Sequence, residues 1–348
     1  MERSMKFRVA AVCAPMMFLA ACGGGGGGDD GAPLPGPAEV QGVVITSTNA
    51  KAVSADAIGA STNTSAAADA GLPVGVQVVP AAAGTGGTLR LGSIARTLAA
   101  KAGALQDVVA GVAVNETLPC SGGGNIVVSG NVNGSDWLMA GDTVTTTARN
   151  CTETVDGVAT TMNGQLTLKV LSGSFYSAAM APFNVTMRVD VSNMSITTGG
   201  VTETMDGDMT LAYASSTANV ETIVISGTSL ATSSNAGGTQ VSVKMKNYRQ
   251  DIGTDHGATT MTVSMGVESR HPRLGNSTVA YEVSTLAAWK TDASGNVTAG
   301  SLKVVGQASQ ATITVTGTNT FEIAVDANAD GSYEQTQSAT LEELRGLH

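Results

Sequence analysis

From residue 125 onward, apolar and polar residues alternate along the chain, and this period of two constrains the fold more than any other feature. Leu166, Leu168 and Val170 alternate with polar neighbours. Strict alternation gives a strand one buried and one solvated face, which is typical of antiparallel sheet. Clusters of glycine, asparagine and aspartate supply the turns between such strands. The same alternation recurs in the segments 183–191, 209–213, 241–245, 261–267, 279–283, 302–304 and 321–325.

A sheet with so many half-solvated strands must close on itself or be covered on one face. The sequence therefore predicts a mainly β (α+β) fold: a long antiparallel meander that forms an open or half-closed barrel or sandwich. One or two N-terminal helices are expected to pack on the sheet, a weak alanine-rich helix at 50–60 and a clearer one at 89–109. The clearer helix carries an apolar stripe, which we interpret as covering the sheet rather than lying on a membrane.

The segment 157–168 is similar in sequence to the segment 200–211, and we call this similarity the internal echo. Asn163-Gly164 in the first copy matches Asp206-Gly207 in the second, and each pair is expected to form a tight turn between two short strands. Two copies are too few for a solenoid. We interpret them as a repeated hairpin within one meander.

Residues 1–21 have the parts of an export signal. Arg3, Lys6 and Arg8 give a positive n-region, and the apolar stretch 9–19 is too short to cross a bilayer as a permanent helix. These features predict that the chain leaves the cytoplasm.

The signal ends in Leu19-Ala20-Ala21-Cys22, which resembles the bacterial lipobox. The resemblance implies cleavage before Cys22 and lipid on that cysteine, so the predicted partner of the N-terminus is a membrane. Several acyl chains give stable anchoring. Gly23 occupies the position where an aspartate retains enterobacterial lipoproteins in the inner membrane, which favours the outer membrane of a Gram-negative bacterium. An ordinary signal peptide that leaves Cys22 free is the less favoured alternative.

A run of glycines and a proline-spaced segment follow, as expected of a flexible and then stiffened spacer. We therefore divide the chain into a removed signal peptide (1–21), a tether (22–38), a partly helical segment (39–115) and an antiparallel β body (116–348) that forms one domain with that segment.

Charge and composition exclude several functions. The net charge is −10, and the body has no basic run. Nucleic-acid binding is therefore not expected, because it needs positive charge against phosphate. Aromatic residues make up 3% of the chain, so the core must consist of aliphatic residues and methionine.

Cys120 and Cys151 are the cysteines left to pair once Cys13 and Cys22 are set aside. An oxidising compartment makes a disulfide the default, and a hairpin of strands 125–132 and 143–148 would bring the two cysteines together. A redox or metal pair is the weaker alternative, because no CxxC motif or histidine cluster accompanies them.

The motifs Pro119-Cys120-Ser121-Gly122-Gly123 and Asn150-Cys151, followed by the 157–164 segment, resemble a loose group of uncharacterised proteobacterial lipoproteins. The resemblance covers about residues 40–215. It supports the disulfide and implies no activity.

Asp326, Asn328 and Asp330 precede Gly331 in the pattern of a calcium-binding loop, in which oxygen ligands alternate along the chain. Gln337 stands where such a loop has its bidentate glutamate. We favour a β-hairpin turn over a structural Ca²⁺ site, and no other cofactor is predicted.

Catalytic motifs for nucleophilic or metal chemistry are not found. His256 follows Asp255, and a triad with a distant serine is a weak alternative because sequence cannot show its geometry. His271 is the other internal histidine, and Trp137 and Trp289 are read as core residues rather than as a ligand site.

The function expected from the sequence is that of a membrane-anchored envelope lipoprotein with a non-catalytic binding, adhesion or structural role. A carrier of lipid or another apolar ligand in a half-open barrel is the alternative, and a hydrolase that uses His256 or His271 is weaker. The partner of the body is an unknown protein or apolar ligand.

Overall fold

One compact unit, residues 40–348, contains all the residues that the computed structural model describes. The expected signal peptide with Cys22, the tether, the 89–109 helix and Trp137 lie outside the described residues. The described ranges are 40–71, 112–132, 139–155, 158–173, 183–217 and 220–347.

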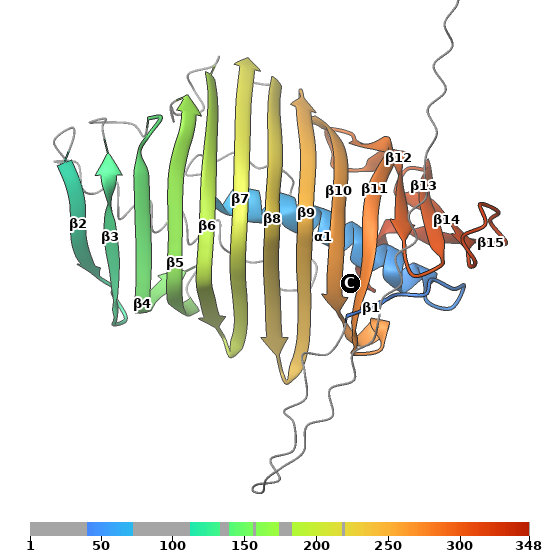
Figure 1. The fold of residues 1–348 in the computed structure, drawn as a ribbon, viewed down its shortest axis with the longest axis horizontal. Coiled ribbons are helices and arrows are strands. Elements are labelled where there is room, and N and C mark those ends of the chain that lie inside the picture. The colour runs from blue at the N-terminus through green and yellow to red at the C-terminus, as the bar shows by residue number, and fades with distance from the viewer. Residues whose placement is uncertain are drawn as a thin grey trace, which may run out of the picture. The chain divides into compact units, whose positions relative to one another are not determined.

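The described strands form a single sheet in which β2 to β15 follow one another in chain order, each antiparallel to the next (Figure 1). β2 and β15 are its two edges and do not pair with each other, so the predicted fold class, a long open antiparallel meander, is confirmed. The short β1 pairs in parallel with β11. The strands are β1 (Gln41–Gly42), β2 (Val112–Pro119), β3 (Asn125–Val132), β4 (Thr143–Val155), β5 (Val158–Gly173), β6 (Phe183–Thr198), β7 (Val201–Thr217), β8 (Val220–Ala236), β9 (Thr239–Asp255), β10 (Ala258–Arg270), β11 (Thr278–Thr291), β12 (Val297–Val305), β13 (Gln310–Gly317), β14 (Thr320–Asp326) and β15 (Gln335–Thr340).

Tight turns set the pairing of the longest strands. The two turn residues have positive φ at Gly199-Gly200, at Gly237-Gly238 and at His256-Gly257. Two left-handed residues in succession match the twist of the flanking strands. These turns therefore hold β6 to β7, β8 to β9 and β9 to β10 in register.

Helix α1 (Ala50–Gly71) packs against one face of the sheet, which we call the inner face. It contacts β8, β9 and β10 as well as β13 and β14, and it crosses the central strands in Figure 1. Its alanines at 50, 55, 57 and 60 are at most 2% exposed, because their small side chains let strands approach from several sides. The prediction of a helix on the sheet is confirmed for α1, which runs past the expected end at residue 60.

Polar contacts fix α1 on the inner face. The buried Asp56 carboxylate accepts hydrogen bonds from the Ser269 hydroxyl (3.0 Å) and the Tyr281 phenol (2.5 Å). Farther along the helix, the Gln250 side chain donates to the Ser61 carbonyl at 3.1 Å. These bonds join α1 to β9, β10 and β11.

The turns predicted at Asn163-Gly164 and Asp206-Gly207 are wrong, because both pairs lie in the middle of long strands, β5 and β7. They belong to β-bulges. Asn150 and Asn193 have left-handed backbones (φ 48° each), and their N–H groups donate to the side chains of Asn163 and Asp206 respectively. The internal echo is therefore a repeated bulge and not a repeated hairpin.

The bulges continue across the sheet as one line, which we call the crease. The register shifts between Gly207 and Thr210 on β7 and between Ser264 and Gly266 on β10, and Asn247 on β9 has φ 45°. A bulge bends its strand and increases the local twist. The crease therefore divides the long strands β4 to β10 into two halves.

Candidate functional site

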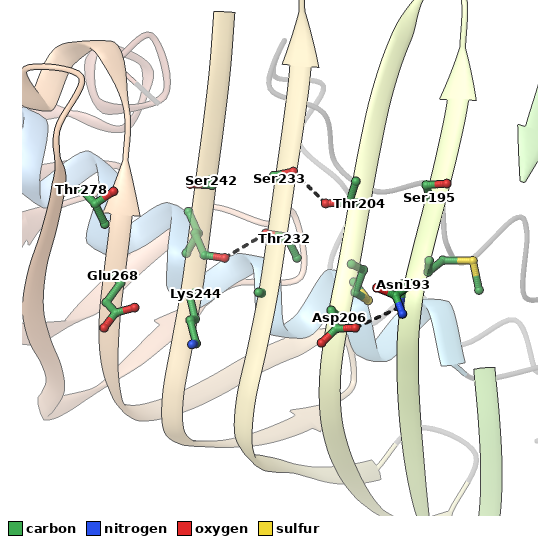
Figure 2. A pocket seen from close by; sticks show the side chains of 14 residues that line it. Asn193, Ser195, Thr204, Asp206, Thr232, Ser233, Ser242, Lys244, Glu268 and Thr278 are labelled. Carbon is green, nitrogen blue, oxygen red and sulfur yellow. Dashed lines mark hydrogen bonds between the residues drawn. The ribbon is translucent and has the colours of Figure 1, made fainter. Parts of the chain in front are cut away.

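A hollow of about 490 Å³ lies beside the crease, and we call it the groove. Figure 2 shows its side chains on neighbouring strands from β6 to β11. Most of them point away from α1, on the outer face of the sheet, because they alternate with buried residues such as Met205 and Val243. The lining consists of Asn193, Met194, Ser195, Thr204, Met205, Asp206, Ala231, Thr232, Ser233, Ser242, Val243, Lys244, Glu268 and Thr278.

Hydroxyl side chains form one row across the strands. Ser195 stands opposite Thr204, Thr204 opposite Ser233, and Ser233 opposite Ser242. Thr204 and Ser233 share a hydrogen bond of 2.7 Å between their hydroxyls. Because neighbouring strands lie about 4.8 Å apart, this row offers hydroxyl groups at regular steps.

A second row, next to the crease, carries charged side chains. Asp206 stands opposite Ala231, Ala231 opposite Lys244, and Lys244 opposite Glu268. Ala231 has the shortest side chain in this row, and the hollow lies above it between the longer side chains of Asp206 and Lys244.

Some of these charges have partners within the sheet. Asp206 accepts a hydrogen bond of 2.9 Å from the Asn193 N–H, and Glu268 pairs with Lys246, which lies just outside the groove. Within the described part of the chain, the Lys244 ammonium and the hydroxyls of Ser195 and Ser242 have no protein partner. The groove therefore combines free donors with free acceptors.

The disulfide between Cys120 and Cys151 is confirmed, with an S–S bond of 1.98 Å and a Cα–Cα distance of 5.4 Å. It joins the loop after β2 to β4, and the predicted hairpin of β3 and β4 is also present. The Ser121 hydroxyl and N–H both donate to the Glu153 carboxylate beside it. Paired sulfurs are not thiolate ligands, so the metal alternative finds no support here.

The loop between β14 and β15 links two antiparallel strands, as the hairpin interpretation expects. Oxygens of Asp326, Asp330 and Glu334 lie within 4.8 Å of one another. The side-chain amide of Asn328 donates a hydrogen bond of 3.0 Å to the Asp330 carboxylate. The side chain of Gln337 donates to the Ser47 carbonyl. A structural Ca²⁺ ion here stays a prediction, which a rise of Tm on adding calcium would support.

Hydrogen bonds explain the acidity of Asp326. Burial alone would raise its pKa, but the side chain of Gln310 and the backbone N–H groups of Gly331, Asn328 and Asp330 outweigh burial and lower the pKa below its usual value. The carboxylate therefore stays ionised and shapes the loop.

The lining of the groove does not include His256, His271 or Trp289. His256, on the β9–β10 turn, pairs with its neighbour Asp255, and its side chain is 75% exposed. His271 accepts a hydrogen bond from the Arg273 N–H at the start of a short 3₁₀ helix, η1 (Pro272–Leu274). Trp289 is buried and stacks on Phe321 with ring centroids 5.5 Å apart, as expected of a core residue.

Comparisons with protein-family models, curated proteins and solved structures give no match. None of the helices in the described ranges is long and apolar enough to span a membrane.

Sequence reasoning missed the groove. The alternation identifies Asp206, Ser233 and Lys244 as polar positions on a strand, but their positions are far apart in the chain. Only the register between β7, β8 and β9 brings them together. The sequence feature that comes nearest to marking this region is the asparagine that recurs along the crease, at Asn150, Asn193 and Asn247, each with a left-handed backbone.

Proposed function

We propose that this chain is an envelope lipoprotein, held to a membrane by lipid on Cys22, whose β body has a non-catalytic binding role in adhesion or envelope structure. The observation that carries the proposal is the polar groove on the outer face of the sheet. Its free ammonium and hydroxyl groups suit recognition of a polar partner.

The chemistry of the groove supports binding rather than catalysis. A serine nucleophile needs a base within hydrogen-bond reach. Among the described residues, the hydroxyls of Thr204 and Ser233 bond to each other and that of Thr232 bonds to backbone, while those of Ser195, Ser242 and Thr278 have no protein partner. None of these hydroxyls bonds to Asp206, Lys244 or Glu268. A hydrolase at His256 or His271 has equally little support, because neither histidine is among the residues that line the groove.

The alternative of an apolar-ligand carrier has less support than a binding role. A carrier needs an apolar space between sheet and helix. Between β8–β10 and β13–β14 that region is occupied by α1, whose alanines are in close contact with the strands. Of the 14 residues that line the groove itself, 10 have polar side chains.

The anchor is tested by lipid labelling in a Gram-negative host. Cells that express the full chain receive an alkyne fatty acid, and the protein is examined for label after Cys22→Ser and, as the matched control, Cys13→Ser. We expect label to disappear with the first change and to persist with the second. Label that survives Cys22→Ser would refute the anchor.

The binding role is tested with matched changes on strand β8. Ala231→Trp fills the groove, whereas Ser226→Trp places the same side chain on the outer face across the crease. Binding of the full-length protein to isolated cell envelopes should fall with Ala231→Trp alone. Equal binding by both variants and the unchanged protein would contradict a role for the groove.

A further inference from the structure

The groove runs across the strands rather than along one of them. The hydroxyl row runs from Ser195 on β6 to Ser242 on β9, where Arg270 of β10 stands next in register. The charged row runs from Asp206 on β7 to Glu268 on β10, and each row takes one residue from each strand. A ligand that follows the rows meets a new side chain about every 4.8 Å. This arrangement suits an extended chain of repeating polar units.

Free hydrogen-bonding groups of both kinds are present along these rows. The Lys244 ammonium donates, the second carboxylate oxygen of Asp206 accepts, and the hydroxyls of Ser195, Ser242 and Thr278 do both. Among the described residues none of these groups has a protein partner. A ligand rich in hydroxyl groups can satisfy all of them.

Charges of both signs stand at the groove, and neither is in large excess. Asp206 and Glu268 are negative and Lys244 is positive; Lys246 pairs with Glu268, and Arg270, which stands in register between Ser242 and Thr278, donates a hydrogen bond to Gln240. A polyanion such as nucleic acid would need a large excess of positive charge. The mixed charges favour an uncharged ligand.

The lining also differs from a protein-docking surface. Such surfaces depend on tryptophan, tyrosine and arginine anchors, and the groove is lined by none of these. Six of its 14 lining residues are serine or threonine, four are other polar residues and four are apolar.

We infer that the groove binds a neutral glycan chain laid across strands β6 to β10, with its hydroxyl groups on Asp206, Lys244 and the serine–threonine row. This inference rests on the proposed binding role and names the class of partner. Ala231 is the floor beneath the glycan, and its small side chain gives the glycan access to its long neighbours.

The test uses the full-length chain in detergent with soluble polysaccharides: dextran, laminarin and galactomannan as neutral probes and alginate as the acidic one. Affinity electrophoresis finds the bound probe and calorimetry measures its Kd. We expect at least one neutral probe to bind, with alginate weaker. Lys244→Gln should weaken binding roughly tenfold, because a charge-assisted hydrogen bond is lost.

Substitutions inside and outside the groove distinguish glycan binding in the groove from non-specific binding elsewhere on the protein. Ala231→Trp should abolish binding of the neutral probe, and Ser226→Trp should leave its Kd unchanged. Failure of every neutral probe, stronger binding of alginate, or equal effects of the two tryptophans would overturn the glycan assignment. If the glycan probes fail while envelope binding still depends on Ala231, the proposed binding role stands and only the glycan class is lost.

Discussion

The phenol oxygen of Tyr281 lies 2.5 Å from the carboxylate of Asp56, and this bond joins β11 to helix α1 within the core. Tyr281→Phe removes the donor and leaves a buried carboxylate oxygen unsatisfied. We expect a loss of about 1–3 kcal/mol in the free energy of unfolding. Urea denaturation measures it, and Tyr333→Phe, which removes an exposed phenol bonded to Thr312, is the control and should change stability little. Equal effects of the two changes would show that the Asp56 contact contributes no more to the free energy of unfolding than an exposed hydrogen bond does.

Alkali should destabilise the fold through buried tyrosines. Burial raises the pKa values of Tyr213, Tyr248 and Tyr281 above 10. A raised pKa in the folded state adds stability that is complete below the unfolded value and is lost as pH rises above it. Each such tyrosine should lower the free energy of unfolding by up to about 1.4 kcal/mol per pH unit above pH 10.

Denaturation curves at pH 9, 10 and 11 check this dependence. Tyr281→Phe should flatten the alkaline slope, because one titrating group is removed. A slope that is unchanged in this variant would argue against a protected Tyr281 phenol.

Acid should weaken the β14–β15 loop through Asp326, whose pKa is lowered in the fold. A lowered pKa gives stability that is present above the unfolded value, near 4, and is lost as pH falls through the folded value. Asp326→Asn should therefore reduce Tm at pH 6 more than at pH 3. Ser332→Ala leaves every donor to Asp326 in place and serves as control. The idea fails if the variant and the unchanged protein lose Tm in parallel between these two pH values.

The crease depends on glycine at position 207. Gly207 has φ 141°, and a Cβ there would lie 2.1 Å from the Ser229 carbonyl oxygen. Gly207→Ala should cost more than about 2 kcal/mol in the free energy of unfolding. Gly253→Ala on β9 is the matched control, since nothing lies within 4 Å of its Cβ position and it should be almost neutral.

Removing the disulfide should lower stability without abolishing the sheet. Cys120 and Cys151 are separated by 31 residues, for which chain entropy gives about 3–4 kcal/mol. The double change to serine should lower the denaturation midpoint by a matching amount, and a reductant should affect the unchanged protein alone. A reductant effect that persists in the double variant would point to another cause.

The alternation of residues such as Leu166 and Leu168 was sufficient to predict an antiparallel meander, because one-sided burial imposes a period of two. The same reasoning failed at Asn163-Gly164. An Asn-Gly pair is a strong hairpin signal, but a left-handed backbone also suits a bulge within a continuous strand. Local conformation alone cannot tell these two outcomes apart.

The groove could not be predicted for a related reason. Each bulge shifts the register by a residue, so a sequence cannot show that Asp206, Ala231 and Lys244 become neighbours. The disulfide was predictable because Cys120 and Cys151 were the cysteines left to pair. Asp56 was not identified as a core residue, because its acceptor role depends on two strands far along the chain.

The strict chain order of β2 to β15 has a consequence for how the protein is made. Each new strand pairs with the one synthesised just before it, so no edge must wait for a distant segment. A polypeptide that emerges N-terminus first from a ribosome or a translocation channel can add strands one by one, and α1 has already left before the sheet begins to grow. An unpaired strand edge is therefore exposed only until the next strand emerges, which shortens the time in which the chain can aggregate.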